Sequence, residues 1–425
     1  MKIRIQKSFL SLLLYFVCNN VFAQDTLKLT LQKADSLLIT NNLSLIANQY
    51  NIDMAKAQII QAKLFVNPEF YFEGNLYNPK ENKPLDIYRM AGGTSEKILT
   101  ISKTFRIAGQ RNKEIQLAET ATKMTEQQFY DLARTLKYQL RQSFYGLLYL
   151  RKAINSVDKQ LALLDETLDA YKVQYEKGNV SLKDYTRLQA TFFQLYNDRT
   201  NLMQETYSHA KVIKTLVVTE NPVSVLLSEK EIGMYSLTKI NLKRLQDSAF
   251  ANRPDLKTVK LQIQYNEMNK KLQKSLATPD LKLGITYDQS GSYVNDYTGF
   301  TISSQLPFFN RNQGNIQMAE IAVKQSQVNL QHIELLIKNE LTENYNQVVQ
   351  IENEYQKTES SFQQQLELMN KGLLENYTKN NISLLEFTDL FEAYNTAIIQ
   401  LNILRSKRIS AYEELNYLTG TELFK

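Results

Sequence analysis

One pattern constrains the fold of this chain more than any other: a polar helical segment stops near a proline and gives way to crowded aromatic residues, and this happens twice. Residues 46–70 align without gaps with residues 257–281, so that Pro68 aligns with Pro279. Two further blocks align in the same order, 102–119 with 303–320 and 175–185 with 377–387. Three ordered blocks predict two copies of one unit of roughly 200 residues.

The alignment divides the 425-residue chain into two tandem repeats joined by a connector. The first repeat spans 24–216, with a hairpin at about 69–107 and long helices at about 109–216. The connector spans 217–250, where mixed patterning around Pro222 and Gly233 predicts one short strand and one helix. The second repeat spans 251–425, with a hairpin at about 280–308 and long helices at about 311–420.

Both repeats contain long segments without helix breakers. Residues 111–175 and 315–379 contain no proline, and their only glycines are Gly146 and Gly372. Apolar residues on the helices of both repeats recur in steps of three and four, which is typical of coiled coils. They are Ile154, Val157, Leu161, Leu164, Leu168, Tyr171 and Tyr175, then Phe387, Phe391, Tyr394, Ile398 and Leu401. The pattern predicts very long helices, although periodicity alone also allows an ordinary globular bundle.

Each long helix is expected to reverse at a tight turn. Gly178 suits a left-handed helix stop, and Ser181 suits the N-cap of the returning helix. In the second repeat Asn380 and Asn381 occupy the same place, and Asn is the usual substitute for Gly in that conformation. Each repeat is therefore predicted to contain an antiparallel helical hairpin.

The segments that follow the two prolines alternate between apolar and polar residues. Leu281, Leu283, Ile285 and Tyr287 alternate with polar or small residues, and Phe70 and Phe72 do so less cleanly. Partner strands are expected at 98–105 and 300–306, with strands of roughly nine residues, a length that crosses a bilayer when tilted. One apolar face toward lipid and one polar face toward water suit the wall of a membrane barrel. The alternative is a soluble hairpin whose apolar face packs on protein.

Four strands are too few to close a ring around a channel. Unpaired sheet edges are not tolerated in lipid, and the smallest common membrane barrels have eight strands. We therefore expect several copies of the chain to contribute strands to one barrel. In this interpretation Pro68 and Pro279 mark the points where a water-exposed helix reaches the membrane and becomes a strand.

The N-terminus has the layout of a secretory signal over residues 1–23, with a basic start, a short apolar core and small residues before the expected cleavage site. The one cysteine, Cys18, lies within it, so no disulfide is expected in the mature chain. Removing Lys2, Arg4 and Lys7 with no acidic residue lowers the formal charge from +6 to +3. Such a mild charge does not favour nucleic-acid binding.

The sequence offers little catalytic chemistry. The two histidines, His209 and His332, are each isolated on a helical stretch, and phosphate-binding and nucleophile motifs are missing. We therefore expect neither an enzyme nor a bound metal or cofactor.

The two repeats and their motifs resemble the TolC family of outer-membrane efflux proteins. Residues 252–256 read NRPDL, which is similar to the family's signature before the second-repeat helix. Residues 42–45 are a weaker match to the same signature in the first repeat. Tyr175, Gly178, Ser181 and Asp184 have the spacing of the family's helix-tip motif. The resemblance covers essentially the whole mature chain.

The resemblance implies a mainly α fold with a membrane β-barrel portion. A homotrimer would form a twelve-stranded barrel in the lipid of the outer membrane of a Gram-negative bacterium, continued by an α-helical periplasmic barrel. The implied function is the exit duct of a tripartite efflux or type I secretion system, which works with a periplasmic adaptor and an inner-membrane transporter. The alternative is a periplasmic helical scaffold or adaptor without a pore, and the cargo is left open.

The resemblance also implies that the tip turns form the constriction and the adaptor contact. The positions that match are Tyr175, Gly178, Asp184, Tyr377, Asn380, Glu386 and Asp389. Rings of acidic residues would favour cations, although acids near a helix N-terminus are also favourable without any such role. Ile382 and Val180 stand where a basic latch residue and its first-repeat counterpart would be, so a salt-bridged latch is not expected there.

Overall fold

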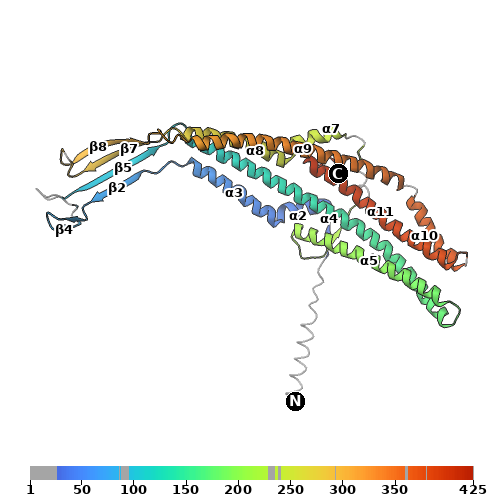
Figure 1. The fold of residues 1–425 in the computed structure, drawn as a ribbon. Helices are drawn as coiled ribbons and strands as arrows, with labels where there is room; N and C mark the ends of the chain where they lie inside the picture. Colours follow the sequence, from blue (N-terminus) through green and yellow to red (C-terminus); the bar gives the residue numbers. More distant parts are fainter. Residues whose placement is uncertain are drawn as a thin grey trace, which may run out of the picture. The chain divides into compact units, whose positions relative to one another are not determined.

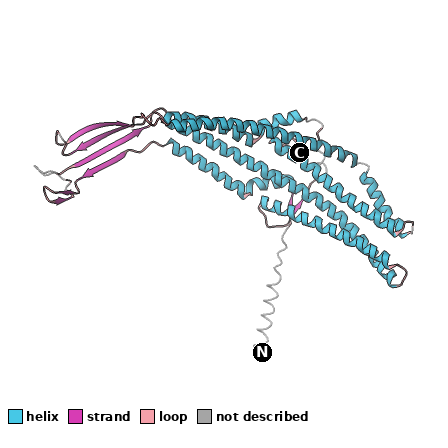
Figure 2. Cartoon of the chain, viewed as in Figure 1, coloured by secondary structure: helices cyan, strands magenta, loops and turns pink. Residues whose placement is uncertain are grey.

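The computed structural model describes residues 26–85, 87, 95–227, 235–237, 241–291, 293–358, 362–379 and 381–424. The predicted signal peptide and Asn380 lie outside these residues. The chain is mainly helical (Figure 2), and its contacts group it into two compact units. Residues 47–131 and 252–337 form a unit with a β-sheet, which we call the sheet unit. Residues 26–46, 132–251 and 338–424 belong to the second, the helical unit. Each unit therefore combines parts of both predicted repeats.

Four antiparallel strands form the sheet of the sheet unit (Figure 1). They are β2 (Glu69–Gly74), β5 (Lys97–Phe105), β7 (Leu281–Asp288) and β8 (Tyr297–Ser304), in the order β2-β5-β7-β8. The β2–β5 and β7–β8 pairs are the two predicted hairpins. In the part of the chain that the structure describes, the sheet is open, with β2 and β8 at its edges.

The strands have six, nine, eight and eight residues, so the expected length of roughly nine holds for β5 and is wrong for β2. After Gly74 the chain turns into a separate small hairpin, β3 (Tyr77–Asn78) with β4 (Lys83–Pro84). Gly74 permits this turn because a Cβ there would lie 3.0 Å from the Ile87 side chain.

The register of the sheet separates apolar from polar side chains. Directly opposed residues share a face, and the faces alternate along each strand. The rows of the apolar face are Phe70–Ile101–Ile285–Phe300, Phe72–Leu99–Tyr287–Thr298, Lys103–Leu283–Ile302 and Phe105–Leu281–Ser304. The polar face includes Glu69–Ser102–Gly284–Thr301, Tyr71–Thr100–Thr286–Gly299 and Thr104–Lys282–Ser303. The predicted alternation is confirmed, and the four residues of the first apolar row are 60–68% exposed.

Four helices connect to this sheet. α3 (Leu43–Lys63) and α8 (Pro254–Leu276) lead into it, whereas α4 (Gln110–Glu176) and α9 (Gln313–Thr358) leave it. Pro254 lies in the first turn of α8, where its missing N–H has no helical partner to lose. At 1.5 Å per residue, the 67 residues of α4 extend over roughly 100 Å.

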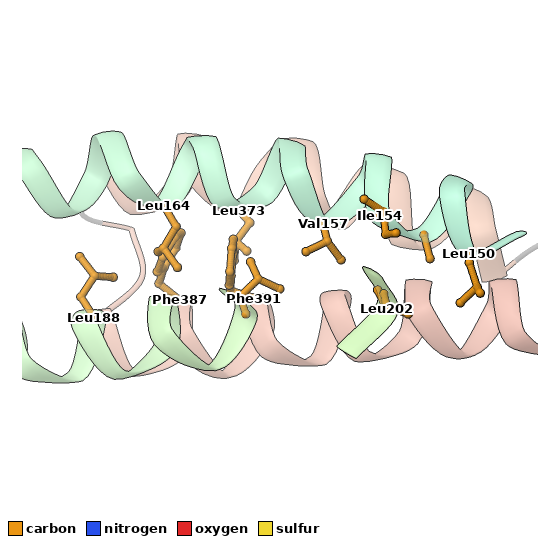
Figure 3. Packing of buried hydrophobic residues seen from close by; sticks show 11 residues of the cluster. Leu150, Ile154, Val157, Leu164, Leu188, Leu202, Leu373, Phe387 and Phe391 are labelled. Carbon is orange, nitrogen blue, oxygen red and sulfur yellow. The ribbon is translucent and has the colours of Figure 1, made fainter. Parts of the chain in front are cut away.

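In the helical unit, α4 is followed by the returning helix α5 (Leu182–Val217), and α10 (Phe362–Thr378) is followed by the returning helix α11 (Leu384–Thr419). Both returning helices contain 36 residues. Buried residues of all four helices meet in one cluster (Figure 3), which includes Ile154, Val157, Leu164, Leu188, Leu373, Phe387 and Phe391. The predicted seam of the second repeat is thus buried, whereas that of the first is buried at Ile154, Val157 and Leu164 and exposed at Tyr175. Both seams pack against helices of both repeats rather than only within one hairpin.

The predicted long helix of the second repeat covers α9 and α10, and residues 359–361 between them lie outside the described residues. α9 ends at Thr358 and α10 begins at Phe362. The Thr358 hydroxyl donates to the carbonyl oxygens of Glu354 and Tyr355, at 3.0 and 3.1 Å.

The connector holds a short strand, β6 (Val223–Val225), and a helix, α7 (Leu242–Asn252). β6 pairs in parallel with β1 (Leu27–Leu29), which precedes α2 (Leu31–Asn41) and was not expected. Among the described residues, no helix is both long and apolar enough to cross a bilayer.

Candidate functional site

The turn between α4 and α5 closes as the sequence predicts. Gly178 has a φ of +77°, in the left-handed region. The Gly178 N–H donates to the Tyr175 carbonyl at 2.9 Å, and the Asn179 N–H donates to the Gln174 carbonyl at 2.9 Å. This pair of bonds is a Schellman motif, which satisfies the last carbonyls of α4. The Ser181 hydroxyl accepts from the Asp184 N–H at 3.1 Å, so the predicted N-cap of α5 is confirmed.

The turn between α10 and α11 repeats this geometry 202 positions later. The Asn381 N–H donates to the Asn376 carbonyl at 2.8 Å, as Asn179 does to Gln174. Ser383 and Glu386 form a capping box at the start of α11. Asn380, which aligns with Gly178, lies outside the described residues. The two tip turns are therefore built by equivalent local chemistry.

Aromatic rings brace both turns. The rings of Tyr175 and Tyr185 stack at 5.3 Å, and their counterparts Tyr377 and Phe387 stack at 4.4 Å. A further stack at 6.2 Å joins Tyr377 to Tyr171 of the first repeat. In the described part of the chain the Tyr377 hydroxyl is buried without a hydrogen-bond partner. The rings hold the tips of the two hairpins together.

The three predicted acids have different surroundings. The Asp184 carboxylate accepts from the Ser181 hydroxyl at 2.7 Å. Glu386 accepts from the N–H and hydroxyl of Ser383, both at 2.8 Å, and these bonds lower the pKa of Glu386. Asp389 is exposed and lies 3.9 Å from Arg187 of the other hairpin. The structure thus brings Asp389 to the first repeat, whereas Asp184 and Glu386 each serve their own cap.

Both predicted entry points lie where a helix gives way to a strand. Pro68 directly precedes β2, and Pro279 lies between the end of α8 and the start of β7. In each repeat a residue from beyond the hairpin satisfies the end of the first helix. Arg111 Nε donates to the Lys63 carbonyl at 3.1 Å, and Asn312 Nδ2 donates to the Gln273 carbonyl at 2.8 Å. The change from helix to strand is therefore built into the local hydrogen bonds.

A buried charge network in the helical unit was not anticipated from the sequence. The Arg141 guanidinium donates to Asp35 at 2.7 Å and to Glu413 at 3.1 Å, and pairs with Glu422 at 3.2 Å. The Tyr235 hydroxyl donates to Glu413 at 2.5 Å, and Asn416 Nδ2 does so at 3.2 Å. Burial opposes the charge of Arg141, but its three carboxylates raise its pKa overall. These residues are far apart in the sequence, and no local pattern marks them as partners.

The described residues contain no group of three or more His, Cys, Asp or Glu side chains that could hold a metal ion. The candidate sites are therefore structural features. The helical unit has two capped turns against which aromatic rings stack, and the sheet unit has an amphipathic sheet whose two edges have no partner strand among the described residues.

The fold of the chain is similar to the folds of solved outer-membrane channels. The Campylobacter jejuni CmeC outer membrane channel has a similar fold, with a TM-score of 0.72 at 14% identity over 92% of this chain and 85% of that one. Residues 245–421 match the model described as outer membrane efflux protein. The resemblance of the chain to TolC-type channels, which the sequence predicted, is therefore confirmed.

Two further proteins are similar to this chain in sequence. The cobalt-zinc-cadmium resistance protein CzcC of Cupriavidus metallidurans is 20% identical over 68% of this chain. The chain spans 66% of CzcC, slightly less than two thirds of that relative's length. Toxin and drug export protein A of Aggregatibacter actinomycetemcomitans is 20% identical over 72% of this chain and 67% of its own length.

Proposed function

We propose that this protein is the outer-membrane exit duct of a tripartite efflux or type I secretion system. The observation that carries the proposal is the sheet of β2, β5, β7 and β8. The row of Phe70, Ile101, Ile285 and Phe300 on its apolar face is exposed, its opposite face is polar, and both of its edges lack a partner strand in the described chain. A membrane barrel needs a lipid-facing apolar surface, a wet interior and closure of every edge.

Closure requires other copies of the chain. Three copies supply twelve strands, within the range of membrane barrels, and the free edge of β2 in one copy then pairs with the free edge of β8 in the next. The polar face becomes the wet lining, where Lys282 and Glu69 pair at 2.5 Å and the hydroxyls of Thr100 and Thr286 lie 2.9 Å apart. In this assembly the helices of both repeats continue the duct on the periplasmic side.

The two tip turns form the periplasmic end of the duct and the contact for the adaptor. The residues assigned to this role are Tyr175, Gly178, Asp184, Tyr377, Asn380, Glu386 and Asp389. Their equivalent caps and stacks support a rigid rim with two hairpin tips per subunit. Cargo passes without chemistry, driven by an inner-membrane transporter. The descriptions of the relatives differ in cargo, from metal ions to toxins and drugs, so the proposal names the route and not the substrate.

The proposal is tested by fractionation and by electrical recording. The mature protein is expected to stay in the outer-membrane fraction after a carbonate wash and to open discrete, water-filled conductances in planar bilayers. Recovery as a washed-out soluble monomer without conductance would support the periplasmic scaffold instead.

The tip assignment has a test of its own. Replacing Asp184 and Asp389 with alanine removes six carboxylates from the rim of a trimer, so cation preference is expected to fall. The matched control is Asp53→Ala, an exposed acid on α3 of the sheet unit. Unchanged ion selectivity in the tip variant would remove these acids from the aperture.

A further inference from the structure

We propose that the junction between helix and strand in the first repeat binds the headgroup of an anionic phospholipid. The site consists of Lys63, Phe65, Lys103, Phe105, Arg106 and Arg111, which we call the junction cluster. The inference rests on the proposed membrane location and adds a specific lipid site to it.

The centre of the junction cluster is an exposed aromatic ring between two cations. Phe65 is 69% exposed. The Arg111 guanidinium lies 4.1 Å from the centre of its ring, and the Lys103 ammonium lies 5.7 Å from it. The same ammonium lies 5.7 Å from the ring of Phe105. Cations above aromatic faces stay partly desolvated and available to an anion, which suits the boundary between water and lipid.

Lys103 occupies an unusual place for a charged residue, on the apolar face of the sheet. It lies in the row with Leu283 and Ile302, one row closer to the helices than the fully apolar row of Ile101. A lysine on a lipid-facing surface places its stem along the apolar side chains and its ammonium at headgroup level. Lys103 therefore marks the height at which phosphate groups lie.

The junction cluster contains more cationic side chains than carboxylate partners among the described residues. Arg106 pairs with Glu114 at 2.6 Å, and Arg111 donates to the Lys63 carbonyl. Among the described residues, neither Lys63 nor Lys103 has a carboxylate partner. A cavity of about 440 Å³ adjoins Phe65 and is lined by Gln58, Gln61, Ala62, Leu64, Val66, Arg106, Glu114 and Ala118. Its lining offers Leu64, Phe65 and Val66 to an acyl chain, whereas Lys63 and Lys103, which have no carboxylate partner in the described chain, lie outside the lining and suit the phosphate.

A second copy of the chain fits this cluster less well. In the proposed trimer the neighbour's β8 brings its own junction, residues 306–312, which read LPFFNRN. This segment contains exposed Phe308 and Phe309, one further cation, Arg311, and no acid. In the repeat alignment Lys103 and Arg106 correspond to Ser304 and Pro307. The neighbour therefore supplies apolar surface but no negative charge, which leaves the phosphate of a lipid as the complementary group.

The test uses the purified full-length protein in detergent. It is titrated with phosphatidylglycerol or with phosphatidylcholine of the same chain length, and bound lipid is counted by native mass spectrometry. The wild type is expected to prefer phosphatidylglycerol. The preference is expected to fall about five-fold for each lysine removed in Lys63→Gln and Lys103→Gln. Lys103→Arg is expected to keep it.

The matched control is Lys123→Gln with Lys324→Gln, two exposed helical lysines of the same unit and the same change in charge. It is expected to leave the lipid preference unchanged. Equal retention of both lipids by the wild type would overturn the proposal, as would equal losses in the test and control variants. A test variant that dissociates the oligomer without changing the lipid ratio would make the cluster a subunit contact. Fractionation and conductance of the same wild-type protein report separately on the proposed function.

Discussion

At the scale of single residues, the tip turns depend on backbone conformation more than on side-chain contacts. Gly178 holds a φ of +77°, and a Cβ added there would meet no atom within 4 Å. Glycine is therefore required at position 178 because of the left-handed backbone conformation and not because of steric crowding. Gly372 lies inside α10, where a Cβ would make an ordinary contact of 3.6 Å with the Asn376 side chain.

These two glycines predict opposite effects of the same substitution. Gly178→Ala is expected to destabilise the protein by about 1 kcal/mol, because alanine resists the left-handed conformation. Gly372→Ala is expected to stabilise it by about 0.5–1 kcal/mol, because alanine favours the helix. Thermal unfolding of the two variants in detergent measures the difference, and equal shifts would contradict the assigned turn.

At the same scale, the close approach of His209 to the backbone of α4 explains why residue 146 is a glycine. A Cβ on Gly146 of α4 would lie 2.6 Å from the imidazole of His209 on α5, so the helix carries its one glycine between 111 and 175 where a side chain crosses it. Burial lowers the pKa of His209, and the nearby Glu205 opposes this only in part. The neutral imidazole is therefore the form that the fold accommodates.

This predicts a stability that depends on pH. Above about pH 6.5, His209 is neutral in both the folded and the unfolded chain and contributes nothing. As the pH falls below that value, the unfolded chain takes up the proton first, so the free energy of unfolding decreases. His209→Gln is expected to show a smaller loss of melting temperature between pH 7 and pH 5. His332→Gln, at an exposed position on α9, serves as the control, and the same pH dependence in both variants would contradict the assignment.

At the scale of elements, the amphipathic sheet was the best predicted part of the chain. Alternation found β7 and its partner correctly because a strand with one apolar and one polar face must switch polarity at every residue. The length of β2 was wrong because the approach of Ile87 to Gly74 is a tertiary contact.

At the scale of elements, we predict that the same substitution has different effects on the two faces of β7. Ile285→Arg puts a charge in the central apolar row and is expected to cost about 2–4 kcal/mol at the bilayer midplane, which lowers the amount of assembled protein in the outer membrane. Thr286→Arg, one residue later, faces the polar side and is expected to assemble near the wild-type level. Quantifying the heat-stable oligomer in membranes compares them, and equal assembly of both variants would contradict a lipid-facing row.

At the scale of the whole molecule, the sequence indicated two repeats but not how they combine. Each compact unit contains segments of both copies, because the seam of α4 packs on α11 as well as on α5. The network of Arg141, Asp35 and Glu413 joins parts of the chain more than 100 positions apart, which no periodic pattern can report. The tip residues were found through a family motif, whereas the junction cluster needed the geometry of the sheet.

The central claim is that this open sheet closes only with other copies of the chain, and cross-linking its two edges tests that most directly. Single cysteines are placed along β2 at Glu69, Tyr71 or Glu73 and along β8 at Gly299, Thr301 or Ser303, in a chain whose one native cysteine, Cys18, lies in the predicted signal. Oxidation of paired variants in membranes is expected to give covalent dimers and trimers and no larger species. Cross-links confined to a single chain, or no cross-link at any pair of positions, would contradict closure by three subunits.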